Sequence, residues 1–268
     1  LLAPGPTPVP AAVLPRMAAP TIHHRTPEFE AIVATVRDQL KQVWQTSQDV
    51  ITLASSGTGA MEASIVNTLS PGDAILCVNG GKFGERWMKM GKTFGLNVEE
   101  LKVEWGKAVD PAAIEAALKK RPEIRAVLVQ ASETSTTVLH PVEQIASITR
   151  TRDTLLMVDG ITSVGVTDMP MDRWGIDVLV SGSQKAFMLP PGLAFIAFSE
   201  RAWKATETAK LPRFYFDLRK ARKGLPTGES AFTPPVSLVF AVQEAIAMMK
   251  EEGLDGVRRA PDDRDAAV

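Results

Sequence analysis

The chain of 268 residues is long enough for one large α/β domain, or for one domain with part of another. Its composition is 45% hydrophobic and 23% charged, as in ordinary globular proteins, and its net charge of −1 gives no electrostatic attraction for nucleic acid. The longest apolar runs fall well short of the roughly 20 residues that span a membrane. We therefore expect neither nucleic acid nor a membrane as a partner.

The cysteine and histidine content bears on disulfides and metal sites. A single cysteine, Cys77, excludes an internal disulfide and is typical of a chain in the reducing cytoplasm, where we place it. The three histidines do not combine with cysteines or carboxylates at metal-ligand spacing, so no metal site is expected. The first ten residues, LLAPGPTPVP, lack the basic region of a secretory signal.

Residues 1–22 are rich in proline and lack periodicity, which predicts an extended N-terminal arm and no helix. A large domain is expected over residues 23–257. It begins with a helix that has Thr26 as its N-cap, Pro27 in its first turn and apolar residues at helical spacing up to Leu40.

From Asp49 onward, short apolar runs alternate with helical segments, among them 60–69, 111–120 and 142–150. The expected strands are VITLAS, AILCVN, NVEELKV, AVLVQ, LLMV, VLV and LAFIAF. Continuous apolar strands that alternate with helices predict an α/β fold with a largely parallel sheet covered on both faces. Ligands bind at the carboxyl ends of the strands in such sheets, so the residues after each run are the candidates for function.

The turn after the first strand, SSGTG at 55–59, leads directly into a helix. Small residues and the unpaired N–H groups of a helix N-terminus can cradle a phosphate. An ordinary glycine-rich βα turn explains the same residues equally well. The stretch is neither a Walker loop nor a dinucleotide fingerprint, because the lysine of the first and the third glycine of the second are missing.

The turns after the next two strands are less specific. Phe83 lies in the glycine-bounded loop GGKFG, where its ring could cover a planar ligand or fill the core. The run 132–137, SETSTT, places several hydroxyls beside a carboxylate.

Asp159 and Lys185 follow two later strands. A carboxylate at the end of LLMV is at least partly buried and needs a cationic or donor partner, which could be a structural arginine or a protonated ring nitrogen. Lys185 stands between VLVSGS and the strand LAFIAF, where burial lowers the pKa of an amine and makes it a nucleophile. The spacing between Asp159 and Lys185 fits neighbouring strands.

Together these parts match the needs of pyridoxal 5'-phosphate (PLP). A lysine forms the Schiff base, an aspartate keeps the pyridine nitrogen protonated, and an anion cradle takes the phosphate.

With these residues identified, the chain resembles the class V, fold-type I PLP-dependent aminotransferases, in particular the alanine/serine–glyoxylate group. Within that group it is similar to members known as the small subunit of cyanobacterial soluble hydrogenase. The stretches that carry the resemblance are PGPTPVP at 4–10, HRTPEF at 24–29, SGTGAMEA at 56–63, NGGKFGERW at 79–87, SETSTTV at 132–138, VDGITSVG at 158–165, SGSQKAFMLPPG at 181–192 and FTPPVSL at 232–238. The resemblance implies the large domain of this fold, with a mainly parallel seven-stranded sheet.

The resemblance also implies roles for individual residues. Lys185 would be the catalytic Schiff-base lysine and proton shuttle, and Asp159 would pair with the pyridine nitrogen. Phe83 and Ile161 would lie on opposite faces of the ring. The remaining implied cofactor contacts are Gly57, Thr58 and Gln184 at the phosphate and Thr134 near the ring hydroxyl.

Further implications concern a second subunit. In the family a threonine of the partner chain reaches the phosphate, and Thr233 matches it, which implies a homodimer. Ser230 stands where a relative has a tyrosine, so that contact is expected to differ. The arm at Pro4–Thr7 and the pair His24–Arg25 are expected near the substrate, which would be a small amino acid or 2-oxo acid.

The pattern departs from the family at its C-terminal end. The resemblance implies a further small domain that supplies the arginine for the substrate carboxylate, and we expect this domain to be largely missing here. Residues 258–268 are expected to be a disordered tail unrelated to the family. We accordingly expect PLP binding but severely impaired turnover, an expectation that full-rate transamination by this polypeptide would contradict.

Two functions remain open from the sequence. The first is an aminotransferase that moves the amino group of alanine or serine to glyoxylate through a Lys185 Schiff base. The alternative is a non-catalytic hydrogenase-associated or interaction subunit, or an inactive PLP-binding fragment. A cysteine desulfurase is disfavoured, because Cys77 lies inside an apolar strand and suits the core better than a mobile nucleophile.

Overall fold

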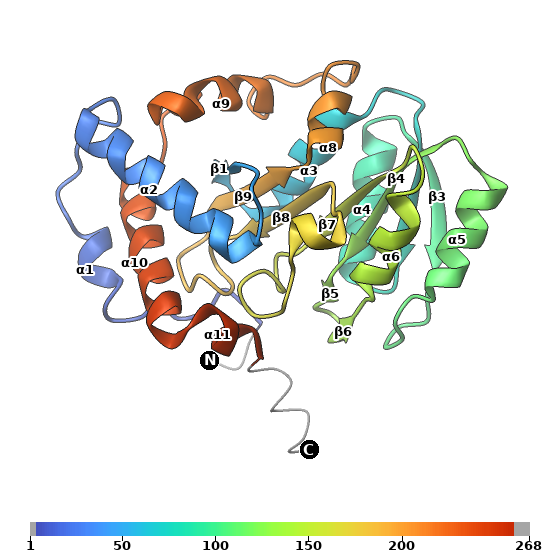
Figure 1. Ribbon diagram of the computed structural model, residues 1–268, viewed down its shortest axis with the longest axis horizontal. Coiled ribbons are helices and arrows are strands. Elements are labelled where there is room, and N and C mark those ends of the chain that lie inside the picture. The colour runs from blue at the N-terminus through green and yellow to red at the C-terminus, as the bar shows by residue number, and fades with distance from the viewer. Residues whose placement is uncertain (1–3, 260–268) are drawn as a thin grey trace.

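Seven strands form one sheet in the order β1-β9-β8-β7-β4-β2-β3 in the computed structural model, which describes residues 4–259 (Figure 1). Only β9 is antiparallel to its neighbours, so the predicted mainly parallel α/β sheet is confirmed. In chain order the strands are β1 Val50–Ser55, β2 Ala74–Asn79, β3 Asn97–Lys102, β4 Ile124–Gln130, β7 Leu155–Asp159, β8 Val178–Gly182 and β9 Gly192–Phe198.

Helices cover both faces of this sheet (Figure 1). One face carries α2 (Pro27–Trp44), α5 (Pro111–Lys120), α6 (Val142–Thr149) and α10 (Val236–Glu252). The other face carries α3 (Gly57–Thr68), α4 (Lys82–Thr93), α8 (Glu200–Ala205) and α9 (Leu218–Gly224). Successive strand residues alternate between the two cores: in β4, Val127 packs on the first face and Leu128 on the second. Burial on both faces explains why the strands read as continuous apolar runs.

The helix starts follow from their caps. The side chain of Thr26 accepts a hydrogen bond from the Phe29 N–H, and that of Asp110 accepts one from the Ala112 N–H. Both caps precede a proline in the first helical turn, where the missing N–H costs nothing. The predicted helix starts at Pro27 and Pro111 are confirmed.

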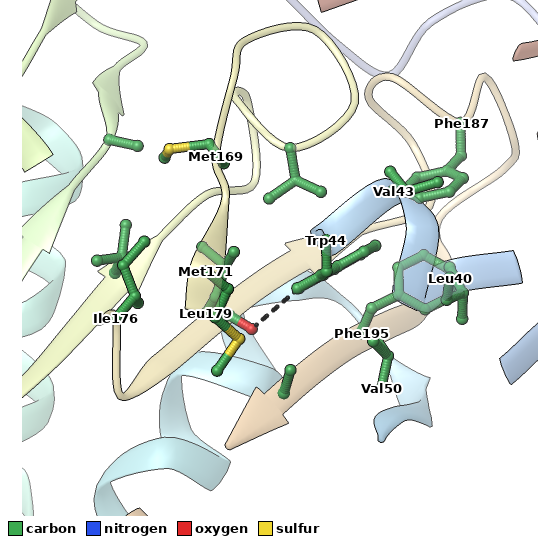
Figure 2. Packing of buried hydrophobic residues seen from close by; sticks show 14 of the residues in the cluster. Leu40, Val43, Trp44, Val50, Met169, Met171, Ile176, Leu179, Phe187 and Phe195 are labelled. Carbon is green, nitrogen blue, oxygen red and sulfur yellow. Dashed lines mark hydrogen bonds between the residues drawn. The ribbon is translucent and has the colours of Figure 1, made fainter. Parts of the chain in front are cut away.

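A buried aromatic group fixes the loop after β8 to the sheet (Figure 2). Trp44, at the end of α2, donates a hydrogen bond from Nε1 to the Leu179 carbonyl at 3.4 Å. Its ring centroid lies 6.0 Å from that of Phe187 and 5.8 Å from that of Phe195. Phe187 is fully buried and follows Lys185 by two residues. The core therefore holds the loop that carries the candidate lysine.

The structure corrects several expected boundaries. The proline-rich arm contains a four-residue helix, α1 (Leu14–Met17), because Pro15 occupies a first-turn position that needs no N–H donor. The helix after β1 starts at Gly57 and not at Ala60, so the small residues of the turn form its first turn.

Other short elements were not predicted. They are the hairpin of β5 (Ser132–Glu133) and β6 (Val138–Leu139), α7 (Met171–Trp174), the 3-10 helix η1 (Leu225–Thr227) and α11 (Leu254–Arg259). The last of these enters the segment 258–268 that was expected to be disordered, and residues 260–268 of that segment lie outside the described residues. Over residues 4–259, no helix combines the length and the apolar character needed to cross a membrane.

Candidate active site

Eight of the nine predicted site residues line one cavity of about 110 Å³ at the carboxyl ends of β7 and β8. They are Gly57, Thr58, Phe83, Thr134, Asp159, Ile161, Gln184 and Lys185. The cavity lies where the strand ends meet the N-termini of α3 and α4, the place at which α/β sheets bind ligands. Residues separated by more than 120 positions in the sequence thus meet in one pocket.

Lys185 reaches this cavity from the loop after β8. Its Nζ donates a hydrogen bond to the Pro4 carbonyl oxygen at 3.3 Å. Desolvation lowers the pKa of this amine, while the negative charge of Asp159 acts in the opposite direction. A lowered pKa increases the share of neutral, nucleophilic amine at a given pH.

Asp159 ends the neighbouring parallel strand β7 and is only 5% exposed. Its Oδ1 accepts a hydrogen bond from the Ile161 N–H at 2.9 Å. Burial raises the pKa of this carboxyl group to about 6, against the opposing effects of that hydrogen bond and of the positive charge on Arg86. A buried carboxylate of this kind is stabilised by a cationic donor placed in the cavity.

The N-terminus of α3 is the candidate anion site. Ser56 caps the helix without a side-chain hydrogen bond, which leaves first-turn N–H groups available to a ligand. A Cβ atom at Gly57 would collide with the side chain of Ile161, so a larger residue here would displace a residue that lines the cavity. The side-chain oxygen of Gln184 is buried at the same cavity without a hydrogen-bond partner in the described part of the chain.

Glu133 positions Phe83, a role that the sequence pattern does not indicate. Its fully buried carboxylate accepts hydrogen bonds from the N–H groups of Phe83 at 3.1 Å and of Gly84 at 3.0 Å, at the N-terminus of α4. The Ser135 hydroxyl donates to the same carboxylate at 2.6 Å. The run of hydroxyls beside a carboxylate is thus partly a helix cap.

The other hydroxyls form a chain along one wall. Thr134 and Thr162 are 3.0 Å apart at their Oγ1 atoms, and the Thr162 hydroxyl donates to the Ser132 carbonyl at 3.3 Å. These residues also border a larger, open groove of about 620 Å³ that reaches from Lys185 to Met248 in α10. The groove leaves one side of Lys185 open to the protein surface.

Arg86 also lines the cavity and was not predicted. It lies three residues after Phe83 in α4, so both side chains leave the helix on the same face. That spacing within GKFGER is the sequence signal that would have indicated it.

Thr233 does not line the Lys185 cavity of its own chain. It borders a shallow pocket with His23 and His24, beside a stack of Tyr215 and Phe232 whose ring centroids are 4.8 Å apart. His24 therefore lies beside Thr233. Of the two segments expected near the substrate, Pro4–Thr7 and His24–Arg25, the structure shows a contact with Lys185 of the same chain for the first, through Pro4.

Cys77 is fully buried in β2. Desolvation, and to a lesser extent the negative charge of Glu100, raises the pKa of its thiol to about 12. A buried thiol that remains protonated is not a mobile nucleophile, which fits its expected place in the core.

Comparison with known proteins places this site in a family. A model of the class V aminotransferases matches residues 1–264. Over 260 residues the chain is 47% identical to the soluble hydrogenase 42 kDa subunit of Anabaena cylindrica, covering 96% of this chain and 68% of that protein. Over 262 residues it is 41% identical to the L-aspartate–glyoxylate aminotransferase of Paracoccus denitrificans, covering 95% and 65%. The alanine–glyoxylate aminotransferase of Nostoc sp. has the same fold, with a TM-score of 0.92, 31% identity and coverage of 96% and 69%.

The chain belongs to the class V aminotransferase family and is a PLP-dependent aminotransferase by family and fold. It spans about two thirds of the length of the proteins it matches. Enzymes of this class act on amino acids and 2-oxo acids. The predicted likeness to soluble hydrogenase subunits is confirmed.

Proposed function

We propose that the cavity around Lys185 holds PLP and that the protein transfers an amino group from alanine or serine to glyoxylate. The observation that carries this proposal is the meeting of Lys185 and Asp159 in one cavity with an open helix N-terminus. Glyoxylate is the acceptor because the names of two relatives include it. The donors follow from the resemblance to the alanine/serine group, and aspartate, which one relative uses by name, is the competitor to test.

The described residues fit the cofactor. The first turn of α3, with Gly57 and Thr58, is a cradle in which a larger residue at Gly57 would displace Ile161, another residue of the same cavity. The unpartnered amide of Gln184 beside it can turn its N–H toward a phosphate oxygen. Asp159 has no cationic hydrogen-bond partner among the described residues. Its carboxylate is therefore available to accept a hydrogen bond from a ring N–H.

When bound, PLP supplies an electron sink for the bonds at the amino acid α-carbon. The chain supplies the rest. Lys185 holds and moves the proton at its Nζ, and Asp159 keeps a proton on the ring nitrogen. Phe83 and Ile161 would hold the ring between them, and Thr134 would contact its hydroxyl side.

A homodimer completes the proposed site. Thr233 borders a surface pocket and does not line the Lys185 cavity of its own chain, which supports a contact with the phosphate in a second chain. We place this dimer in the cytoplasm, where the buried thiol of Cys77 stays reduced.

A non-catalytic role is the second candidate, because a relative at 47% identity is named as a hydrogenase subunit. Stepwise spectroscopy separates the two. The PLP-loaded protein is mixed with alanine, serine or aspartate, and glyoxylate is then added alone. The proposal expects the visible cofactor band to decay fastest with alanine or serine and to return with glyoxylate; a band that no donor changes supports the non-catalytic role.

A further inference from the structure

We infer that Arg86 is a positioning residue of the proposed cofactor site, which ties the aromatic plate Phe83 to the anion cradle at Thr58 and holds the Thr58 hydroxyl ready to donate to a phosphate. The inference rests on the proposed function and adds a residue to it.

The contacts of Arg86 join two helices. Its Nη1 donates a hydrogen bond to Thr58 Oγ1 at 2.9 Å, from α4 to the first turn of α3. Its guanidinium carbon lies 4.7 Å from the centroid of the Phe83 ring, within the range of a cation–π contact. One side chain thus fixes the relative positions of the ring that would cover the cofactor and the helix end that would hold its phosphate.

The direction of the hydrogen bond determines what Thr58 can do. A guanidinium has only donors, so the Thr58 oxygen must accept from it. The hydroxyl proton of Thr58 is then free to point at another acceptor. Since the neighbouring groups of the cradle are backbone N–H donors, the acceptor that suits all of them is an anion.

Arg86 also lacks the acidic partner that an ordinary surface arginine has. On the same helix, Lys82 and Lys89 both pair with Glu85, at 3.3 and 3.9 Å. Arg86 takes part in no ion pair with a residue in the range 4–259, although it lines the cavity. Its charge is therefore directed at the ligand site.

The charge acts on both titrating groups of the cavity. It lowers the pKa of Asp159 and lowers that of Lys185, whose other charged neighbour is Asp159 itself. Both effects favour the charge states that the proposed chemistry needs, an ionised aspartate and a neutral amine.

The test compares Arg86→Gln with Arg86→Lys, and uses Lys89→Gln as the control that removes a charge from the same helix. Dissociation constants for PLP and for inorganic phosphate are measured by titration. We expect Arg86→Gln to raise both dissociation constants by roughly tenfold or more, as for loss of a charged hydrogen bond. Lys89→Gln should change neither constant by more than about twofold. Arg86→Lys keeps the charge without the planar fork, so it should fall between them and serves if the glutamine variant does not fold.

A double variant tests the route through Thr58. In a Thr58→Val background, Arg86→Gln should cost much less phosphate affinity than in the wild type, because the hydroxyl it orients is gone. The pH dependence of Lys185 labelling by an amine reagent in the apo protein gives an independent reading, with its midpoint moved to higher pH in Arg86→Gln. Equal losses in both backgrounds, or wild-type affinities in Arg86→Gln, would overturn the inference. Failure of the wild type to bind PLP would instead overturn the proposed function.

Discussion

The Nζ atom of Lys185 donates a hydrogen bond to the carbonyl oxygen of Pro4 at 3.3 Å, across a sequence separation of 181 residues. The arm is held there by Thr7, whose N–H and hydroxyl donate to the backbone carbonyls of Gln184 and Lys185 at 3.2 Å each. The N-terminal arm is therefore a wall of the candidate site. It sets where the lysine side chain can lie.

Gly5 is the position at which this wall is most sensitive. Its φ of +154° is rarely adopted by other residues, and a Cβ there would lie 2.7 Å from Lys185 Nζ. We expect Gly5→Ala to displace the arm or the lysine at a cost of about 1–3 kcal/mol, which corresponds to PLP binding weaker by a factor of roughly 5 to 150. The control is Gly256→Ala, where a Cβ meets nothing within 4 Å. Wild-type PLP affinity in Gly5→Ala would mean that the arm does not restrict the lysine.

Lys185→Ala should abolish the visible absorption band of the PLP-loaded protein. Lys185 is the only primary amine among the described residues that line the cavity, so no other group can take its place. Lys82→Ala is the matched control, because Lys82 is an exposed lysine at the start of α4 and its removal should leave the band intact. An unchanged band in Lys185→Ala would show that Lys185 does not form the Schiff base with PLP.

The adjacency of Asp159 and Lys185 could be predicted because it depends only on local patterns. Each follows a continuous apolar run, parallel strands place their carboxyl ends at one edge, and β7 and β8 do pair. The contact of Lys185 with Pro4 could not be predicted, since the arm has no periodicity that would place it.

The roles of Glu133 and Arg86 depend on tertiary packing. Glu133 reaches the N-terminus of α4 only because the β5–β6 hairpin folds toward it, and two-residue strands give no sequence signal. Arg86 reaches Thr58 because α3 and α4 lie side by side, which single helical patterns do not reveal.

Phe187→Ala should destabilise the protein and loosen the lysine loop together. Phe187 is fully buried between Trp44 and Phe195, so truncation leaves a cavity and costs about 3–5 kcal/mol of unfolding free energy. Urea unfolding measures this cost. Phe214→Ala, at a side chain that is 72% exposed, should change the free energy by about 0.5 kcal/mol or less. Equal costs for the two variants would show that the aromatic group does not anchor the loop.

Asp159→Asn should make the apo protein more stable relative to wild type as the pH rises. Desolvation raises the pKa of Asp159 in the folded state to about 6 from an ordinary 3.8. The folded state then binds more protons than the unfolded state between these values, so wild-type stability falls as the pH rises from about 4 through 6 and the loss persists above. At 1.36 kcal/mol per unit the loss is about 3 kcal/mol, and asparagine, which keeps an acceptor for the Ile161 N–H, avoids it.

Denaturant unfolding of the apo forms at pH 4 and pH 8 tests this linkage. A constant penalty from the buried amide cancels when the two pH values are compared, so the readout is the change in the difference between variant and wild type. Asp153→Asn, at a carboxylate that is 89% exposed, should show almost no change. A difference that is independent of pH in Asp159→Asn would contradict the raised pKa. With PLP bound the order should reverse, because a protonated ring nitrogen gives the wild-type carboxylate the buried partner that it otherwise lacks and gives the amide none.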